Sequence, residues 1–402
     1  MNGKYHQLNI GLKKKMKNNI PYKKHNSFTS LKGKNIINVK DVTSKIIRLY
    51  KNSDLKIFDT NQKNILKDIL SNLNENVNIN IKDEGLKFNL KQNVLDEIHT
   101  IDDKDLLRYL IHRYRYEIYP KKKILDDYPP YLQIEPSSFC NYRCVFCFMT
   151  DNSFNQKKDG YMGRMKLDLF KNIIDDAEGN VEFISLASRG EPLAAPEISE
   201  MLEYTNGKFL NLKINTNASL LDEKKCHAIL SGGIKTLVIS ADAADEKLYS
   251  KLRVNGSLSK ILKNIELFNK IKDSQYPGSK IITRVSGVKV SEAQSFNDME
   301  KLWGGLVDQV AFVDYNPWEN SYEKDSNEII EPCSDLWRRM FVWWDGISNP
   351  CDVDYKSKLS AGKFPEKNLK ELWKSEIYTK IRTSHLQNDR QSLKPCNACE
   401  VI

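Results

Sequence analysis

The stretch Cys140-Asn-Tyr-Arg-Cys144-Val-Phe-Cys147 places three cysteines within eight residues. A short apolar segment ahead of it, residues 131–136, is predicted to be a strand. Three thiolates at this spacing can each bind one iron of a [4Fe–4S] cluster and leave the fourth iron without a protein ligand. A structural zinc site is the alternative, but it usually contains two Cys-x-x-Cys pairs or a nearby histidine. No such ligand stands nearby in the sequence, which favours the cluster.

Apolar runs and amphipathic stretches alternate around and after this cysteine motif. Strands are predicted at 131–136, 181–187, 210–216, 235–240, 281–288 and 308–314, and helices at 165–178, 196–205, 222–231, 257–271 and 293–303. A repeated strand–helix order gives a parallel sheet with right-handed crossovers. Eight such units need about 250 residues and six therefore about 190, which is the length of 131–315. The sequence predicts an α/β fold with a partial (β/α)6 barrel.

The cysteine spacing, with an aromatic residue before the third cysteine, resembles the signature of the radical S-adenosylmethionine (SAM) superfamily. The resemblance implies that Phe146 lies beside the adenine of SAM. It extends to the ends of the predicted strands, where a parallel barrel carries its chemistry. The other residues that it assigns to SAM are Arg189, Gly190, Glu191, Thr216, Asn217, Ser240, Asp242 and Arg253.

Several of these positions carry specific roles in the family that the sequence resembles. The segment 188–192 is similar to the Gly-Gly-Glu-type motif that holds the methionine amino group, with Arg189 in place of the first glycine. Ser240 matches a ribose contact, and Arg253 matches an arginine that pairs with the SAM carboxylate, a task suited to a guanidinium. Singly, a Ser or Asn at a strand end is more often a helix N-cap, and Arg253 alone could form a surface ion pair. The assignment depends on the joint match.

A second group of cysteines follows the predicted barrel and comprises Cys333, Cys351, Cys396 and Cys399. Four thiolates can saturate one auxiliary [4Fe–4S] cluster, with zinc as the alternative. Segments 340–346 and 350–352 look like a strand–turn–strand, and 370–375 like the helix after it, of a SPASM/twitch extension. Four cysteines resemble the shorter twitch form of the butirosin-pathway cyclitol dehydrogenase group. The remaining cysteine, Cys226, is predicted to be packed on a helix flanking the barrel.

The formal net charge of +9 lies entirely in residues 1–36, which contain nine lysines and no Arg, Asp or Glu. We predict that this basic tail is disordered. The predicted domains are the tail (1–36), a small N-terminal α/β appendage (37–125), the radical SAM barrel (126–318) and the SPASM/twitch domain (319–402). Within the appendage, helices are predicted at 61–75 and 102–117 and strands at 77–81 and 86–90. Nucleic acid could bind only through the tail.

Two further classes of protein are disfavoured by the sequence. No run approaches the roughly 18 uninterrupted apolar residues of a membrane span, and the basic N-terminus has no apolar core like that of a secretory signal. We therefore expect a cytoplasmic protein. In a reducing compartment, closely spaced cysteines indicate metal or redox chemistry rather than disulfides.

The resemblance implies that the first cluster, reduced by a donor such as flavodoxin or ferredoxin, cleaves SAM to a 5′-deoxyadenosyl radical that abstracts hydrogen from a substrate. We expect that substrate to be a hydroxyl-bearing small molecule, a sugar, sugar nucleotide or cyclitol, oxidised with the auxiliary cluster as electron acceptor. An epimerase would need a hydrogen-atom donor, and the only thiol outside the two groups is Cys226. Peptide or protein modification, epimerisation and a non-catalytic iron–sulfur or RNA-binding role are the alternatives. Arg284 and Asn316 are the predicted substrate-contact residues.

Overall fold

The computed structural model describes residues 27–30, 38–75, 86–315 and 321–402. Its centre is a ten-stranded sheet in the order β1-β9-β8-β6-β5-β4-β2-β10-β11-β12. The six predicted barrel strands are all present and all parallel: β2 (Tyr131–Ile134), β4 (Phe183–Leu186), β5 (Asn211–Thr216), β6 (Thr236–Ser240), β8 (Ile282–Lys289) and β9 (Gln309–Asp314). The predicted α/β fold with a parallel sheet is therefore confirmed.

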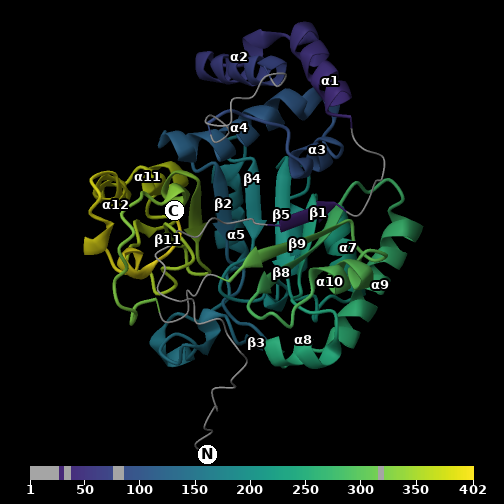
Figure 1. The fold of residues 1–402 in the computed structure, drawn as a ribbon, viewed down its shortest axis with the longest axis vertical. Helices are drawn as coiled ribbons and strands as arrows, with labels where there is room; N and C mark the ends of the chain where they lie inside the picture. The colour runs from purple at the N-terminus through teal and green to yellow at the C-terminus, as the bar shows by residue number, and fades with distance from the viewer. Residues whose placement is uncertain (1–26, 31–37, 76–85, 316–320) are drawn as a thin grey trace, which may run out of the picture.

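The helices between these strands cover one face of the sheet (Figure 1). They are α5 (Leu167–Ala177), α6 (Ile198–Tyr204), α7 (Glu223–Ser231), α8 (Glu246–Leu252), α9 (Leu258–Gln275) and α10 (Phe296–Trp303). The side chains that the sheet buries in one core with these helices include Leu132, Ile134, Ile184, Leu186, Leu212, Ile214, Leu237 and Ile239. Because side chains alternate along a strand, the residues between them face the other way. They include Gln133, Ser185, Lys213, Asn215, Ser240, Arg284 and Ser286, so the second face is polar.

The C-terminal segment continues the same sheet. Strand β10 (Arg339–Val342) pairs in parallel with β2, and β11 (Ile347–Asn349) and β12 (Gly362–Lys363) follow in antiparallel order. Helices α11 (Leu369–Trp373) and α12 (Glu376–Leu386) come next. The expected strand–turn–strand is present, with its second strand at 347–349 rather than at 350–352, and the expected helix is present as α11. Trp373 and Tyr378 belong to the core that also contains Leu132 of β2, so the predicted boundary at 318/319 does not separate two hydrophobic cores.

The N-terminal appendage is helical in its described residues, and one of its two predicted strands is absent. Its helices are α1 (Val39–Asn52), α2 (Thr60–Glu75), α3 (Gln92–Ile98) and α4 (Leu106–Lys122). Residues 86–90 form no strand. Phe88 and Leu90 are buried against the helices, and the Phe88 N–H donates to Asn72 Oδ1 at 2.8 Å. Their alternation thus reflects packing against helices rather than strand pairing. The other predicted strand, 77–81, lies outside the described residues.

Part of the predicted basic tail also differs from the expectation. Residues Ser27–Ser30 form strand β1, which pairs antiparallel with β9 at one edge of the sheet. The rest of 1–36 that was expected to be disordered lies outside the described residues, as does Asn316.

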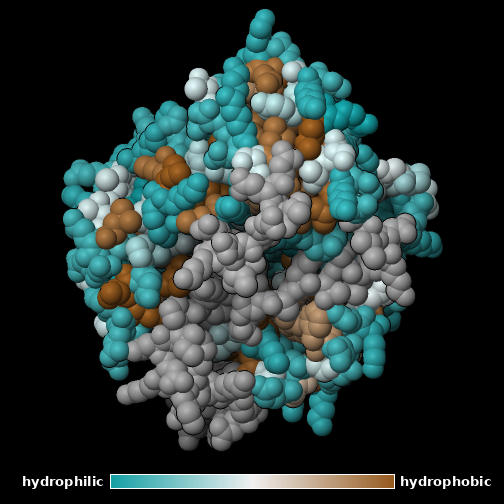
Figure 2. Space-filling view, turned by 45° about the horizontal axis from the view of Figure 1, so that its top comes forward, coloured by the Kyte–Doolittle hydropathy of each residue, from teal (hydrophilic) through white to brown (hydrophobic). Residues whose placement is uncertain are grey.

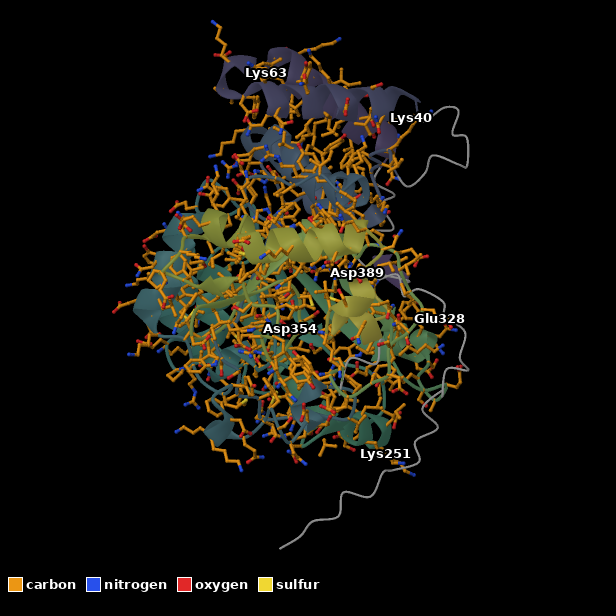
Figure 3. The ribbon with its side chains drawn as sticks, turned by 90° about the vertical axis from the view of Figure 1, so that its left-hand side faces the viewer. Lys40, Lys63, Lys251, Glu328, Asp354 and Asp389 are labelled. Carbon is orange, nitrogen blue, oxygen red and sulfur yellow. The ribbon has the colours of Figure 1, made fainter. Side chains whose placement is uncertain are left out.

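The appendage and the cysteine motif lie at opposite ends of the molecule. Figure 1 shows α1 and α2 at one end and β3 (Arg143–Cys144), which contains the second cysteine of the motif, near the other. Figure 3 shows the same separation, with Lys40 and Lys63 at one end and Lys251 of α8 at the other. Figure 2 shows hydrophobic side chains at several places on this face, including the top of the view. Val39, Ile57 and Leu86 are exposed hydrophobic residues of the appendage. The parallel strands therefore run from the appendage toward the cysteines.

A buried polar cluster joins the appendage to the starts of the strands. Glu97 of α3 is 4% exposed. Its carboxylate accepts hydrogen bonds from Tyr109 Oη at 2.7 Å, Asn211 Nδ2 at 2.8 Å and Lys213 Nζ at 3.2 Å. Burial alone would raise the pKa of Glu97, but the charges of Lys213 and Arg113 outweigh it and lower that pKa to about 2 from its ordinary value of 4.5.

We predict that Glu97→Gln lowers the free energy of unfolding at pH 7 by about 3 kcal/mol, because it leaves buried cations without their carboxylate. Since the pKa is lower in the folded state, the stabilisation is complete above pH 4.5 and is lost as the pH falls toward 2. Urea unfolding at several pH values measures the difference between parent and variant. The exposed Glu203→Gln is the control, and equal midpoints for the two variants at pH 7 would contradict the prediction.

Candidate active site

Each of the three clustered thiols lies beside at least one N–H donor. The Tyr142 backbone N–H lies 3.4 Å from Cys140 Sγ, the Met149 N–H lies 3.5 Å from Cys147 Sγ, and Arg253 Nη1 lies 3.6 Å from Cys144 Sγ. The short pairing of β3 with β7 (Arg253–Val254) sets Arg253 directly opposite Cys144. Hydrogen bonds to sulfur are among the features by which proteins tune an iron–sulfur cluster.

The three thiols also affect one another electrostatically. Burial raises the pKa of Cys140 to about 12, and the Glu191 carboxylate and Cys144 add to the rise. Burial also raises the pKa values of Cys144 and Cys147, and Cys147 is raised further by the other two thiols. Such thiols keep their protons until a metal displaces them. None of the eight cysteines, all of which the structure describes, forms a disulfide.

The ends of the second and third predicted strands are tied to this loop by a hydrogen-bond network. The buried Glu191 carboxylate accepts from Thr216 Oγ1 at 2.6 Å, from the Asn217 N–H at 2.8 Å and from the Leu193 N–H at 3.1 Å. Asn217 Nδ2 donates to Asn141 Oδ1 at 3.0 Å and lies 3.9 Å from Cys140 Sγ. The predicted residues Glu191, Thr216 and Asn217 are therefore brought together beside Cys140.

Gly190 and Ser188, which precede Glu191 in the same loop, show that the backbone here is closely packed and strained. A Cβ on Gly190 would lie 2.2 Å from the Ser137 carbonyl oxygen, so only glycine fits beside the loop after β2. Ser188 has φ 135°, a strained value for a residue with a side chain. Its Oγ is buried and has no hydrogen-bond partner among the described residues. Sequence reasoning placed Ser188 in the motif but did not single it out.

A second set of predicted residues meets beside Cys144. Arg253 Nε donates to Asp242 Oδ2 at 2.5 Å, and Asp242 Oδ1 accepts the Val288 N–H at 2.7 Å. The Arg253 guanidinium lies 5.5 Å from the centre of the Phe146 ring. Ser240 ends β6 on the polar face and is half-buried. The structure thus gathers Phe146, Ser240, Asp242 and Arg253 around the C-terminal ends of β6 and β8.

Arg189 occupies a different environment from the one expected. Its guanidinium binds both oxygens of Glu135, through Nε at 2.8 Å and Nη2 at 2.5 Å, and Nη1 donates to the Tyr355 carbonyl at 3.0 Å. The same group lies 4.2 Å from the Trp343 ring centre. Nε and Nη2 thus join the segments that follow β2 and β4, and Nη1 joins them to the C-terminal segment. Because all three guanidinium nitrogens have protein partners, the structure does not support a SAM contact by this side chain.

Of the two predicted substrate-contact residues, the structure describes only Arg284, and it does not bring Arg284 to the cysteine motif. Arg284 lies near the start of β8, four residues before Val288, and its Nε donates to Gln309 Oε1 at 2.7 Å. Burial lowers its pKa, and Glu97 acts in the opposite sense. Arg284 is thus part of the polar cluster beneath the appendage, which corrects the prediction. Asn316 lies outside the described residues.

The four C-terminal cysteines come from three separate segments and influence one another electrostatically. Cys333 precedes a short 3-10 helix, Cys351 follows β11, and Cys396 and Cys399 flank the last turn. Burial raises the pKa of Cys396 well above its ordinary value, and Cys399 and Cys333 raise it further. The pKa of Cys351 is raised by burial and then by Cys396, Asp352, Asp354 and Cys399.

Three residues that sequence reasoning missed surround this second group. The backbone N–H of Cys333 donates to His385 Nδ1 at 3.2 Å, and burial lowers the pKa of His385 to about 3. Lys123 Nζ donates to the Pro332 carbonyl at 3.2 Å. Arg390 donates to backbone carbonyls of the last turn. Lys123 is far from Cys333 in the sequence and meets it only through the tertiary structure, so no local signal marks it.

The donor chemistry of both groups fits iron–sulfur clusters. In a [4Fe–4S] cluster each thiolate binds its own iron, so three thiols leave one iron open and four leave none. Among the described residues, no three His, Cys, Asp or Glu side chains converge on a position for a single metal ion. The described residues also contain no helix long and apolar enough to cross a membrane.

These features define an iron–sulfur protein built on a parallel α/β sheet, and family comparisons agree. The Radical SAM superfamily model matches residues 134–283, and the SPASM model, an iron–sulfur cluster-binding domain, matches residues 333–400. Residues 134–283 thus form a Radical SAM domain, and residues 333–400 form a SPASM domain.

Individual relatives are distant. The AdoMet-dependent heme synthase of Methanosarcina barkeri (strain Fusaro / DSM 804) is 26% identical over 60% of this chain and 64% of its own length. The chain thus spans under two thirds of the first curated relatives it matches. Streptococcus suis SuiB bound to S-adenosylmethionine has a TM-score of 0.50 at 18% identity, over 90% of this chain and 86% of that chain, which shows a shared fold. BtrN in complex with AdoMet and 2-DOIA covers 67% of this chain and 92% of that chain at 18% identity with a TM-score of 0.44, so the twitch-type group stays a prediction.

Proposed function

We propose that this protein is a radical SAM oxidoreductase that converts a hydroxyl-bearing small molecule, a sugar, sugar nucleotide or cyclitol, into a carbonyl compound. The substrate loses a hydrogen atom from carbon to the 5′ carbon of SAM, a proton from its hydroxyl to solvent, and one electron to the auxiliary cluster. The supporting observation is the second cysteine group, in which neighbouring thiols raise the pKa of Cys351 and Cys396. Four thiolates on one cluster would leave no iron open to a substrate, and such a cluster suits electron transfer.

The protein's own residues have the following proposed roles. Cys140, Cys144 and Cys147 hold the first cluster, which together with bound SAM supplies the radical. Glu191 and Ser188 lie where the methionine end of SAM is expected, and the orphaned Ser188 Oγ offers it a hydrogen bond. Arg253 is oriented by Asp242 beside Cys144. A flavodoxin or ferredoxin delivers the first electron.

The polar face of the sheet is the proposed substrate surface. Asn215, Ser240 and Ser286 lie on neighbouring strands of that face, and Asn215 is exposed although it lies within a central strand. Amide and hydroxyl groups both donate and accept hydrogen bonds, as the hydroxyls of a polyol do. A hydroxyl-rich substrate would therefore find partners on this face.

The test is anaerobic incubation of the reconstituted full chain with SAM, a chemical reductant and a panel of polyols, sugar nucleotides and cyclitols. We expect one of these compounds to give 5′-deoxyadenosine and a carbonyl product in equal amounts. The double variant Cys396→Ala/Cys399→Ala is the control: it should still cleave SAM but form no carbonyl product. If no compound in the panel yields a carbonyl product, the proposal is wrong.

Peptide modification is a second candidate function. SuiB, whose fold matches this chain over 90% of its length, has also been determined bound to the precursor peptide SuiA. Mycofactocin maturase MftC of Mycobacterium tuberculosis (strain CDC 1551 / Oshkosh) is 23% identical over 45% of this chain. A short peptide encoded beside the gene, with an altered mass after co-expression with this protein, would favour this candidate over polyol oxidation.

A further inference from the structure

Arg390 is the most unusual buried charge among the described residues. It is 1% exposed, and its guanidinium donates to four backbone carbonyls. Arg390 Nη2 donates to the carbonyls of Cys399 at 2.8 Å and Cys396 at 3.1 Å, at the two ends of the last turn. Nη1 donates to the carbonyls of Glu331 at 2.9 Å and Val401 at 3.3 Å. Its Nε is buried and has no hydrogen-bond partner in the described part of the chain.

Other buried arginines show what is missing at this site. Arg113, Arg189 and Arg253 each form an ion pair with a carboxylate, from Glu117, Glu135 and Asp242 respectively. Arg382 forms none, but it stacks on the Trp373 ring at 4.2 Å. Arg390 has no ion pair with any described carboxylate, and its neighbour Asp389 is exposed and bound to Ser392 instead.

A buried guanidinium without a counter-charge is costly, so an anion is expected nearby. The four-cysteine site provides one, because a cluster held by four thiolates is negatively charged, and more so once it is reduced. The Arg390 charge reaches this site, since it lowers the pKa of Cys396. Lys123 adds a positive charge beside Cys333. Asp352 and Asp354 act in the opposite sense on Cys351.

We propose that Arg390 is a positioning residue for the auxiliary cluster: it fixes the Cys396–Cys399 turn through two carbonyls and compensates the cluster's charge. This inference rests on the proposed function, in which that cluster accepts an electron. A positive charge next to a cluster stabilises its reduced, more negative state. Arg390 therefore raises the reduction potential and makes the cluster a better acceptor.

The experiment isolates the auxiliary cluster by using the Cys140→Ala/Cys144→Ala/Cys147→Ala background and follows its reduction by EPR in an anaerobic redox titration. We expect Arg390→Gln to lower the equilibrium constant for reduction at least tenfold, which for a one-electron couple is about 59 mV. Arg390→Lys keeps the charge and should stay within tenfold of the parent. Lys394→Gln, which removes an exposed charge two residues from Cys396, is the matched control and should shift the potential less than Arg390→Gln does.

Several outcomes would overturn the proposal. An unchanged potential in Arg390→Gln with full iron content would mean that the guanidinium only supports the fold. If Arg390→Gln binds no iron, Arg390→Lys decides: a tenfold loss despite the retained charge, or no iron in that variant either, contradicts charge compensation. The titration contains no substrate, so its result stands whether or not a polyol is oxidised. Conversely, failure of the polyol assay leaves the measured potential intact.

Discussion

Reductive cleavage of SAM is expected to fall to background when Cys144 is replaced by alanine, and equally for Cys140→Ala or Cys147→Ala. Each thiol would hold a different iron of the first cluster, so two remaining thiols would leave a second iron without its protein ligand. Release of 5′-deoxyadenosine from SAM under a chemical reductant, quantified by chromatography, measures the loss.

The matched control is Cys226→Ala. Cys226 is buried on α7 and packs in the hydrophobic core, and none of the other cysteines contributes to its pKa. Its replacement should leave SAM cleavage close to that of the parent. Parent-like cleavage in any one of Cys140→Ala, Cys144→Ala or Cys147→Ala would show that the three thiols do not hold the catalytic cluster.

Iron content is the second large expected effect. A chain that carries two [4Fe–4S] clusters should contain about eight iron atoms, and Cys396→Ala/Cys399→Ala should reduce this to about four. These substitutions remove two thiols but keep the backbone carbonyls that Arg390 binds. Elemental analysis of the anaerobically purified protein measures its iron and zinc content. About four irons together with one zinc in the parent would assign the second site to zinc.

The order of strands and helices in the barrel could be predicted because each strand buries one face against helices. Runs such as 210–216 and 235–240 contain that buried set in plain alternation, and the strands form within one or two residues of the predicted bounds. The same signal was wrong at 86–90. Phe88 and Leu90 also alternate and are buried, yet they pack against helices and have no neighbouring strand. Alternating apolar residues indicate that one face of a segment is buried. Whether the segment pairs as a strand depends on a partner strand elsewhere in the chain, which the local sequence does not show.

In the candidate site, too, features that follow from the local sequence could be predicted, and contacts between distant segments could not. The motif residues Glu191, Thr216 and Asn217 stand at strand ends, and parallel strands bring their ends together, so their meeting was predictable. The partners of charged side chains could not be predicted from the sequence. Arg189 pairs with Glu135 and Arg284 lies near Glu97, and both carboxylates come from distant segments. Lys123 was missed for the same reason, because only the tertiary fold places it beside Cys333. Arg390 lies six residues before Cys396, but the sequence does not show that its guanidinium binds the carbonyls of Cys396 and Cys399.

The parallel pairing of β10 with β2 has a consequence for truncating this protein before its C-terminal segment. A strand with unpaired N–H and C=O groups is a template for aggregation, and β2 would present such a border if the chain stopped before β10. By pairing with β2, strand β10 of the C-terminal segment therefore covers an edge of the parallel sheet that would otherwise be open. A shortened protein without residues 339–402 would therefore lose the second cysteine group and would also expose β2 as an unpaired edge strand prone to aggregation.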